Sequence, residues 1–292
     1  MTTAQSWHRD EPAYDLDTRG GRVSLERTFA RRGPMSQRQG QTSVSVTYTN
    51  EFQSYKVSEE ALNSPGFLKT LIALGLDPLN GTAHGRLSSV DVDVHRSTAD
   101  SSLNARRGYT IDGHVERAGS ILQGDYDFAE VILEGRYYIA LGERAVIAVK
   151  ARGGSIGRPN GDNLAVPFYR RYWLGGATSL RGWGRFEVSP LFAGVPVGGH
   201  TMIESSAELR APVWGNLSAV LFADAGNVWN NAWAFELGSL RYDVGPGLRY
   251  LTPIGPIRLD LGYQLNPIDG LLINGKKQER RYRFHFSIGQ AF

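Results

Sequence analysis

Hydrophobic and polar residues alternate with a period of two along much of the chain, and the last segment shows this pattern most clearly. Between Arg281 and Ile288 the even positions carry aromatic or aliphatic side chains, whereas the odd positions carry charged or small ones. Successive side chains of a β-strand point to opposite faces, so the pattern predicts a strand with one apolar and one polar face. Ile257–Leu265 and Leu240–Tyr250 repeat it with leucine and tyrosine against arginine, aspartate and glycine.

The same alternation predicts eleven strands, most of them 9–12 residues long. A tilted strand that crosses a bilayer needs about 9–11 residues, whereas a strand of a soluble protein usually has about 5–6. The lengths therefore favour an all-β fold of the membrane type over a soluble β-sandwich, which is the alternative. The predicted fold is an antiparallel transmembrane β-barrel with about eleven or twelve strands in this chain. The other strands are Gly21–Phe29, Gln41–Phe52, Leu87–Arg96, Arg107–Arg117, Asp127–Leu141, Arg144–Arg152, His200–Ala211, Leu217–Gly226 and Arg281–Phe292.

The predicted connections alternate between short and long. Thr252–Pro256, Ala140–Glu143 and Ala211–Asn216 are tight turns with long links between them. Outer-membrane barrels have short periplasmic turns and longer outer loops, so the last strand should run toward the periplasm. Tryptophan and tyrosine near strand ends predict interfacial girdles, with ordinary turn packing as the alternative for the tryptophans. The long links are Gln53–Gly85, Ile156–Gly199, Asn227–Ser239 and Asn266–Glu279, and the girdle candidates are Trp214, Trp229, Trp233, Tyr250 and Tyr263.

The strand count and the N-terminal residues bear on whether this chain contains all strands of the barrel. Eleven strands counted back from a periplasmic C-terminus place residue 1 on the outer side. Bacterial single-chain barrels have an even number of strands, so either a strand in residues 9–18 or 66–79 escapes the pattern or the first strands lie outside this chain. The first residues also lack the apolar core of a signal peptide, which favours an N-terminal truncation.

Composition and motifs narrow the function classes. The chain of 292 residues has 21% charged residues, a net charge of +3 and no basic block suited to nucleic acid. It has no cysteine, and its six histidines show no metal-ligand spacing such as H-x-x-x-H. Nucleotide-binding and serine-hydrolase motifs are absent. His114 and Ser206, the side chains that an outer-membrane phospholipase would need, both face inward by parity, but nothing else links them. The sequence therefore predicts no metal, no cofactor and no enzyme.

Six short segments in the second half of the chain carry the most specific signal. They are Tyr172–Gly176, Leu180–Trp183, Glu204–Arg210, Phe222–Trp229, Gly245–Asp260 and Ser287–Phe292. In this order and spacing they resemble the bacterial surface antigen superfamily, the BamA/TamA-type outer-membrane assembly and translocation barrels. The match is strongest over 169–292, and Trp183 stands where the family more often has phenylalanine or tyrosine. The resemblance implies that residues 1–292 are one barrel domain, part of a barrel of about 16 strands.

The resemblance also implies that the 156–199 link folds back into the lumen of the barrel. There the arginine of its motif, Arg181, would meet the carboxylates of Glu208 and Asp224 on the inner wall. Parity supports this placement, because Leu209 lies on the apolar face and Glu208 therefore faces the lumen. The alternative is a solvated loop arginine. The residues of the lumen motif are Gly175, Gly176, Leu180, Arg181, Gly182 and Trp183.

By the same resemblance, the protein would assemble, insert or translocate proteins at the bacterial outer membrane without enzymatic chemistry. Its partners would be outer-membrane lipid and unfolded outer-membrane or secreted client proteins. Periplasmic accessory proteins would bind through polypeptide-transport-associated domains, which are not visible in this chain. The alternative is a passive channel or a surface antigen without insertase activity. In the family the first and last strands of the barrel pair weakly and form a seam. The resemblance implies that the last strand of this chain is one side of that seam, with the residues Tyr282, Phe284, Phe286, Ile288, Gly289 and Phe292.

Overall fold

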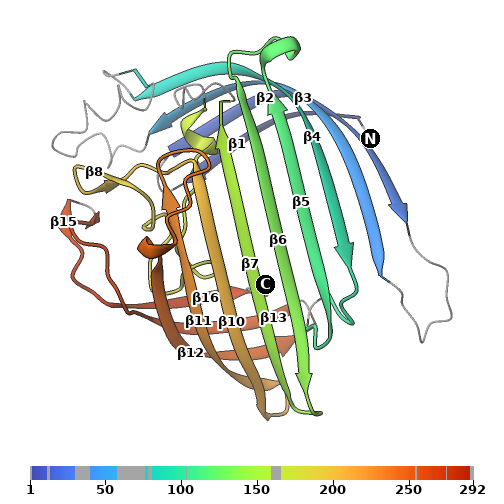
Figure 1. Ribbon diagram of the computed structural model, residues 1–292, viewed down its shortest axis with the longest axis vertical. Helices are drawn as coiled ribbons and strands as arrows, with labels where there is room; N and C mark the ends of the chain where they lie inside the picture. Colours follow the sequence, from blue (N-terminus) through green and yellow to red (C-terminus); the bar gives the residue numbers. More distant parts are fainter. Residues whose placement is uncertain are drawn as a thin grey trace.

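Twelve long strands form one antiparallel sheet in which each strand pairs with its neighbours in chain order. The computed structural model describes residues 2–11, 14–29, 40–57, 76–77, 81–102, 104–158, 166–253, 255–273 and 275–289. The sheet is curved, and the 166–200 segment lies on its concave side, which faces the lumen (Figure 1). The strands are β1 (Thr2–Glu11), β2 (Tyr14–Phe29), β3 (Gln41–Val57), β4 (Thr82–Ser97), β5 (Gly108–Ala118), β6 (Phe128–Leu141), β7 (Ala145–Gly157), β10 (Thr201–Trp214), β11 (Leu217–Trp229), β12 (Arg241–Thr252), β13 (Gly255–Gln264) and β16 (Tyr282–Ile288). Among these described strands, β1 and β16 are the edges of the sheet and do not pair with each other.

The connections contain only short elements in the described residues. Two small hairpins and three turns of 3-10 helix occur there, and no described helix is long and apolar enough to cross a membrane. They are β8 (Leu191–Phe192) with β9 (Val195–Pro196), β14 (Leu272–Ile273) with β15 (Lys276–Lys277), η1 (Ser120–Leu122), η3 (Phe168–Arg170) and η4 (Leu237–Ser239).

All eleven predicted strands are present, and the twelfth is β1. The pattern misses β1 because it carries threonine, serine, glutamine and charged residues with no apolar row. The window 9–18 overlaps β1 and the start of β2, whereas 66–79 lies outside the described residues apart from Leu76 and Asp77. With twelve antiparallel strands, Thr2 begins β1 on the side where β16 ends. An odd count would have placed the start of the first strand on the outer side. The extra strand β1 instead agrees with the alternative of a missed strand.

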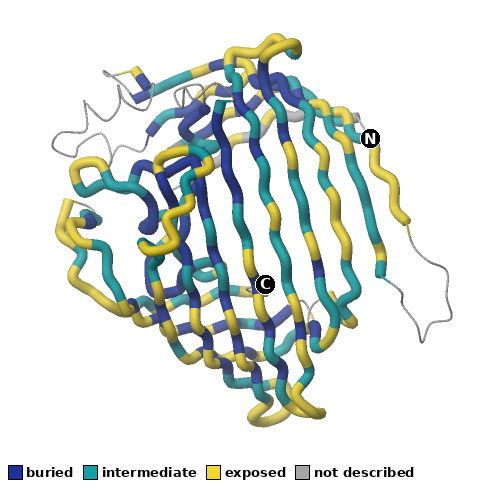
Figure 2. The backbone as a smooth tube through the Cα atoms, in the orientation of Figure 1, coloured by how far each residue is buried: buried dark blue, intermediate teal, exposed yellow. Residues whose placement is uncertain are grey.

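Burial in the wall is inverted relative to a soluble protein. On β13 the side chains of Arg258 and Asp260 are each 1% exposed, whereas Leu259 and Leu261 are 36% and 43% exposed. Figure 2 shows the same alternation of buried and exposed positions along the other strands. Charged side chains thus face the concave side and apolar side chains face outward, as in a barrel whose outer surface contacts hydrocarbon. A soluble sandwich would cover the apolar face instead.

Most of the aromatic girdle candidates lie on the outer surface. Trp214, Trp233, Tyr250 and Tyr263 are exposed near strand ends, where interfacial aromatics are expected. Trp229 is only 6% exposed, and its ring Nε1 donates to Ser239 Oγ at 2.8 Å. Its assignment to a girdle is therefore wrong, and ordinary turn packing describes it.

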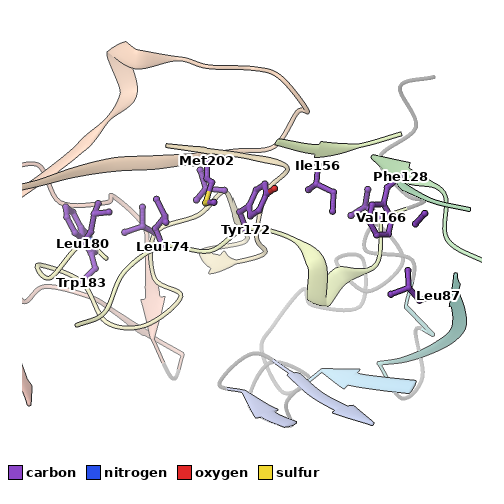
Figure 3. Close-up of a cluster of buried hydrophobic side chains, with 12 residues drawn as sticks. Leu87, Phe128, Ile156, Val166, Tyr172, Leu174, Leu180, Trp183 and Met202 are labelled. Atoms are coloured by element: carbon purple, nitrogen blue, oxygen red, sulfur yellow. The ribbon is translucent and has the colours of Figure 1, made fainter. Parts of the chain in front are cut away.

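The main hydrophobic core lies inside the barrel, between the wall and the link that follows β7. β7 extends to Gly157 and β10 starts at Thr201, so the link is 158–200 rather than 156–199. We name its described part, 166–200, the lumen loop. Its apolar side chains pack against inward-facing wall residues in a row that Figure 3 displays. The cluster comprises Val166, Tyr172, Leu174, Leu180, Trp183 and Val188 from the loop, and Leu87, Ala118, Phe128, Ile156, Met202 and Val228 from the wall.

Candidate functional site: an arginine in the lumen

Neighbouring strands β10 and β11 place carboxylates on the inner wall. Ser206 lies directly opposite Asp224 in the antiparallel register, and Glu208 follows two residues along β10. All three side chains are buried, whereas Leu209 and Leu221 on the other face are exposed. Period-two alternation thus directs two carboxylates and a hydroxyl to one patch of the lumen.

The guanidinium of Arg181 occupies this patch. Its Nε and Nη2 donate to the two oxygens of Asp224 at 2.8 and 2.7 Å, Nη1 donates to Glu208, and Nη2 also donates to Ser206 at 2.9 Å. The backbone N–H of Arg181 reaches Asp224 as well, at 3.2 Å. The structure therefore brings together the arginine and both acidic partners that the sequence named. The paired contact with Asp224 uses the planar fork of arginine, which lysine cannot reproduce.

Burial makes this arrangement energetically demanding. Arg181 is 1% exposed, and its charged group lies 3.6 Å from the centre of the Phe222 ring. Burial alone would lower the pKa of Arg181, but the hydrogen bond to Asp224 and the nearby carboxylates raise it above its usual value. The guanidinium stays charged, so loss of a partner would leave an uncompensated buried charge, at a cost of about 3–5 kcal/mol. A solvated loop arginine does not describe this side chain.

Further arginines extend the network around Glu208. Arg210 Nε donates to it at 2.8 Å and Arg249 Nη2 at 3.3 Å. Arg249 also donates to Asp260, which in turn accepts from Arg258 at 2.9 Å. Positive and negative groups alternate through the buried cluster, which links β10, β12 and β13.

Glycines let the loop approach the wall closely. A Cβ on Gly182 would lie 2.6 Å from the Cβ of Asp243, and one on Gly262 would lie 2.3 Å from the carbonyl oxygen of Arg181. Gly175 and Gly176 have φ angles of +104° and +101°, a region that side chains with a Cβ rarely adopt. These four positions require glycine because of contact or backbone conformation.

Two apolar residues of the motif anchor the loop on either side of Arg181 and Gly182. Leu180 and Trp183 are both fully buried in the core cluster. The backbone N–H of Trp183 donates to the carbonyl of Leu180, and the carbonyl of Trp183 accepts from the N–H of Gly176 at 3.0 Å. The motif therefore forms a compact turn whose apolar members fix the position of the charged one.

Several wall residues that the sequence did not name bind the backbone of this turn. Lys150 donates to the carbonyl of Thr178 at 2.9 Å, and Arg258 to that of Ala177 at 2.8 Å. Gln264 donates to the carbonyl of Gly182 at 2.7 Å. Parity alone could have assigned these side chains to the lumen, but their partners are backbone atoms that no residue pattern reveals.

The terminal strand also touches the lumen loop. His285 Nε2 lies 2.9 Å from the carbonyl oxygen of Arg181, and Arg283 donates to Glu187. Burial raises the pKa of Glu187, although the Gly184 N–H and Arg283 oppose this shift. The inward face of β16 is thus attached to the loop that carries Arg181.

The outward face of β16 carries the predicted seam residues. Tyr282, Phe284, Phe286 and Ile288 are 59–65% exposed, and no described layer covers them. Gly289 has a φ of +102° and donates to the carbonyl of Pro256 at 2.8 Å. Phe292 lies outside the described residues. Among the described strands, β16 and β1 are the two edges of the sheet.

Comparison with known proteins identifies the family. The model of the Omp85 superfamily domain matches residues 3–292. The chain belongs to the Omp85 superfamily. This agrees with the family, the all-β barrel fold and the outer-membrane location expected from the sequence.

Relatives of this Omp85 chain are larger proteins. It is 31% identical over 214 residues to the outer membrane protein assembly factor BamA of Nitratidesulfovibrio vulgaris, covering 70% of this chain and 26% of that protein. It is 25% identical over 254 residues to BamA of Neisseria meningitidis, covering 74% and 30%. A crystal structure of Haemophilus ducreyi BamA lacking POTRA domains 1-3 matches with a TM-score of 0.70 and 18% identity, covering 96% of this chain and 56% of that one. The chain thus spans about a quarter to a third of these two relatives.

Proposed function

We propose that this chain is the barrel of an outer-membrane machine that assembles, inserts or translocates proteins, and that it works without enzymatic chemistry. Its relatives include outer membrane protein assembly factors. The observation that carries the proposal is the lumen loop, held on the inner wall by Arg181 with Asp224 and Glu208. Burying charged groups costs desolvation free energy, and a pore that only conducts solutes would not need a lumen loop held by such groups.

The proposed role of the loop is to keep the wall in a working arrangement. Arg181 binds side chains on β10 and β11, while its carbonyl oxygen contacts His285 on β16. A single turn of the loop thus connects the middle of the sheet with its last strand. Loss of the arginine would loosen this connection and leave the edge strand less well positioned.

The two edge strands support the proposed mode of action on client proteins. An exposed strand edge offers backbone N–H and C=O groups to which an extended segment can add. β16 combines such an edge with an outward row of aromatic and aliphatic side chains that suits lipid. The proposed partners are therefore outer-membrane lipid and unfolded outer-membrane or secreted client proteins. Periplasmic accessory proteins would act through domains N-terminal to the barrel.

The proposal is tested by measuring client insertion into liposomes that contain the protein. Arg181→Ala should slow the folding of an unfolded outer-membrane client by several fold, because the loop loses both of its carboxylate partners. Arg136→Ala is a matched control, since Arg136 faces the lumen but pairs with Glu134 on its own strand. An equal insertion rate for wild type, Arg181→Ala and protein-free liposomes, together with ion conductance through the wild type, would support the passive channel instead.

A further inference from the structure

The inner face of β4 and β5 carries a group of metal-ligating side chains outside the arginine site. Three cross-strand pairs at every second position of the antiparallel register consist only of aspartate, glutamate and histidine. The alternate positions Val92 and Val94 are exposed on the outer surface, so the ligating side chains face the lumen. The pairs are Asp91 with Glu116, Asp93 with His114, and His95 with Asp112.

Three of these side chains converge on one point. The imidazole Nδ1 of His114 lies 2.7 Å from a carboxylate oxygen of Asp93, and Asp91 interacts with Asp93 through its side chain. One ligand atom from each of the three lies within 4.8 Å of the others. Ligands of a single Zn²⁺ lie about 3–4 Å apart, because each bond is about 2.0–2.2 Å long. Small rotations of these partly exposed side chains would bring their ligand atoms from within 4.8 Å of one another to the spacing that Zn²⁺ needs.

Charge and access both favour a cation at this point. Among the described residues, no lysine or arginine lies within ion-pair distance of Asp91 or Asp93. Arg22 attracts Asp91 from farther away, and the ionic partner of Asp93 is His114. Two adjacent carboxylates repel each other unless a proton or a cation lies between them. A cavity of about 500 Å³ in the lumen is lined by Asp93 and His114, so an ion and its water ligands can reach them.

A neighbouring combination of ligands is less suitable. His114, Glu116 and Glu130 also approach one another closely enough to hold an ion. However, Arg170 donates to both of these glutamates, and Tyr172 donates to Glu130 at 2.7 Å. Their negative charge already has a cationic partner, so an added metal ion would have to displace the arginine.

We propose that Asp91, Asp93 and His114 bind a divalent transition-metal ion of the Zn²⁺ type on the inner wall, with lumen water as the remaining ligand. An imidazole nitrogen with carboxylate oxygens suits Zn²⁺, whereas Ca²⁺ and Mg²⁺ prefer oxygen ligands alone. The ion would join β4 to β5 and is independent of the proposed assembly function. The ligand spacing within any one segment predicts no metal, because this site needs Asp-x-Asp on one strand and histidine on the next.

Calorimetric titration of the metal-free, refolded full chain in detergent micelles with Zn²⁺ tests this site. The wild type should bind one ion per chain, and Asp93→Asn and His114→Gln should each weaken binding by at least about tenfold. His8→Ala is the matched control, because His8 and Asp17 form an exposed cross-strand pair of the same type at 3.0 Å on β1 and β2. This variant should bind Zn²⁺ like the wild type, and Ca²⁺ should not compete.

Two results would overturn the proposal. One is the absence of Zn²⁺ binding by correctly folded wild type, with folding checked by heat-modifiable electrophoretic migration. The other is wild-type affinity in both Asp93→Asn and His114→Gln. If either variant fails to fold, the wild type with Co²⁺ still decides, because bound Co²⁺ in a nitrogen and oxygen site should give visible absorption bands distinct from those of the aqueous ion.

Discussion

Arg181 and Asp224 face each other side-on inside the barrel, with two parallel N–H···O bonds of 2.8 and 2.7 Å joining guanidinium and carboxylate. Arg181 comes from the lumen loop and Asp224 from β11, so this pair fixes a long connection to the wall. Both side chains are almost completely buried. The pair therefore acts as a joint between loop and wall, and its strength depends on geometry as much as on charge.

The stability of the contact between the lumen loop and the wall should depend on the shape of the cationic side chain at position 181. Arg181→Ala should destabilise the barrel by about 3–5 kcal/mol, because it leaves the buried carboxylate of Asp224 without its cationic partner and removes one of the three arginines around Glu208. Arg181→Lys keeps the charge but loses the fork, so most of this loss should remain. Denaturant unfolding in micelles, followed by tryptophan fluorescence, measures both effects. Full stability in the lysine variant would mean that charge alone holds the loop.

The close approach of loop and wall should tolerate no added methyl group. Gly262→Ala would place a Cβ 2.3 Å from the carbonyl oxygen of Arg181, so the loop must shift, at a cost of about 1–3 kcal/mol. Gly135→Ala is the matched control, because a Cβ there meets nothing within 4 Å. The midpoint of denaturant unfolding compares the two. Equal midpoints would show that the loop does not rest on Gly262.

The outward apolar face should reject charge only where it contacts hydrocarbon. Leu261 is exposed in the middle of β13, so Leu261→Arg should destabilise the barrel in a bilayer by about 2–4 kcal/mol. Leu237 is also exposed but lies in the connection between β11 and β12, and Leu237→Arg should have little effect. Folding efficiency into liposomes measures the difference. An equal loss in both variants would contradict the assignment of the two positions.

The sequence predicts the strands of the barrel better than the contacts inside the lumen. Alternation on β13 and β16 identifies both faces because charged and apolar residues differ strongly at neighbouring positions. β1 has no apolar row, and so its pairing with β2 is invisible to the same reasoning. Parity gives the side of the wall on which Trp229 or His285 lies, but not its depth or partner. Trp229 is covered by the connection that follows it, which only the fold reveals.

The arginine site illustrates the same limit. The resemblance named Arg181, Glu208 and Asp224 because the family motif spans those residues. Lys150 and Arg258 bind backbone carbonyls of the lumen loop, and such contacts leave no trace in residue types. The sequence does not reveal the proposed metal ligands on β4 and β5 for a related reason, since these residues come together only through strand register.

A double-mutant cycle between Arg181 and Asp224 tests the central claim most directly. The free energy of unfolding is measured for the wild type, Arg181→Met, Asp224→Asn and the double variant, all in the same micelles. A buried paired contact predicts a coupling energy of at least about 2 kcal/mol, so the double variant should be much less destabilised than the sum of the two single variants. Additivity within about 0.5 kcal/mol would contradict the account, because it would mean that the loop arginine and the wall carboxylate do not meet in the folded barrel.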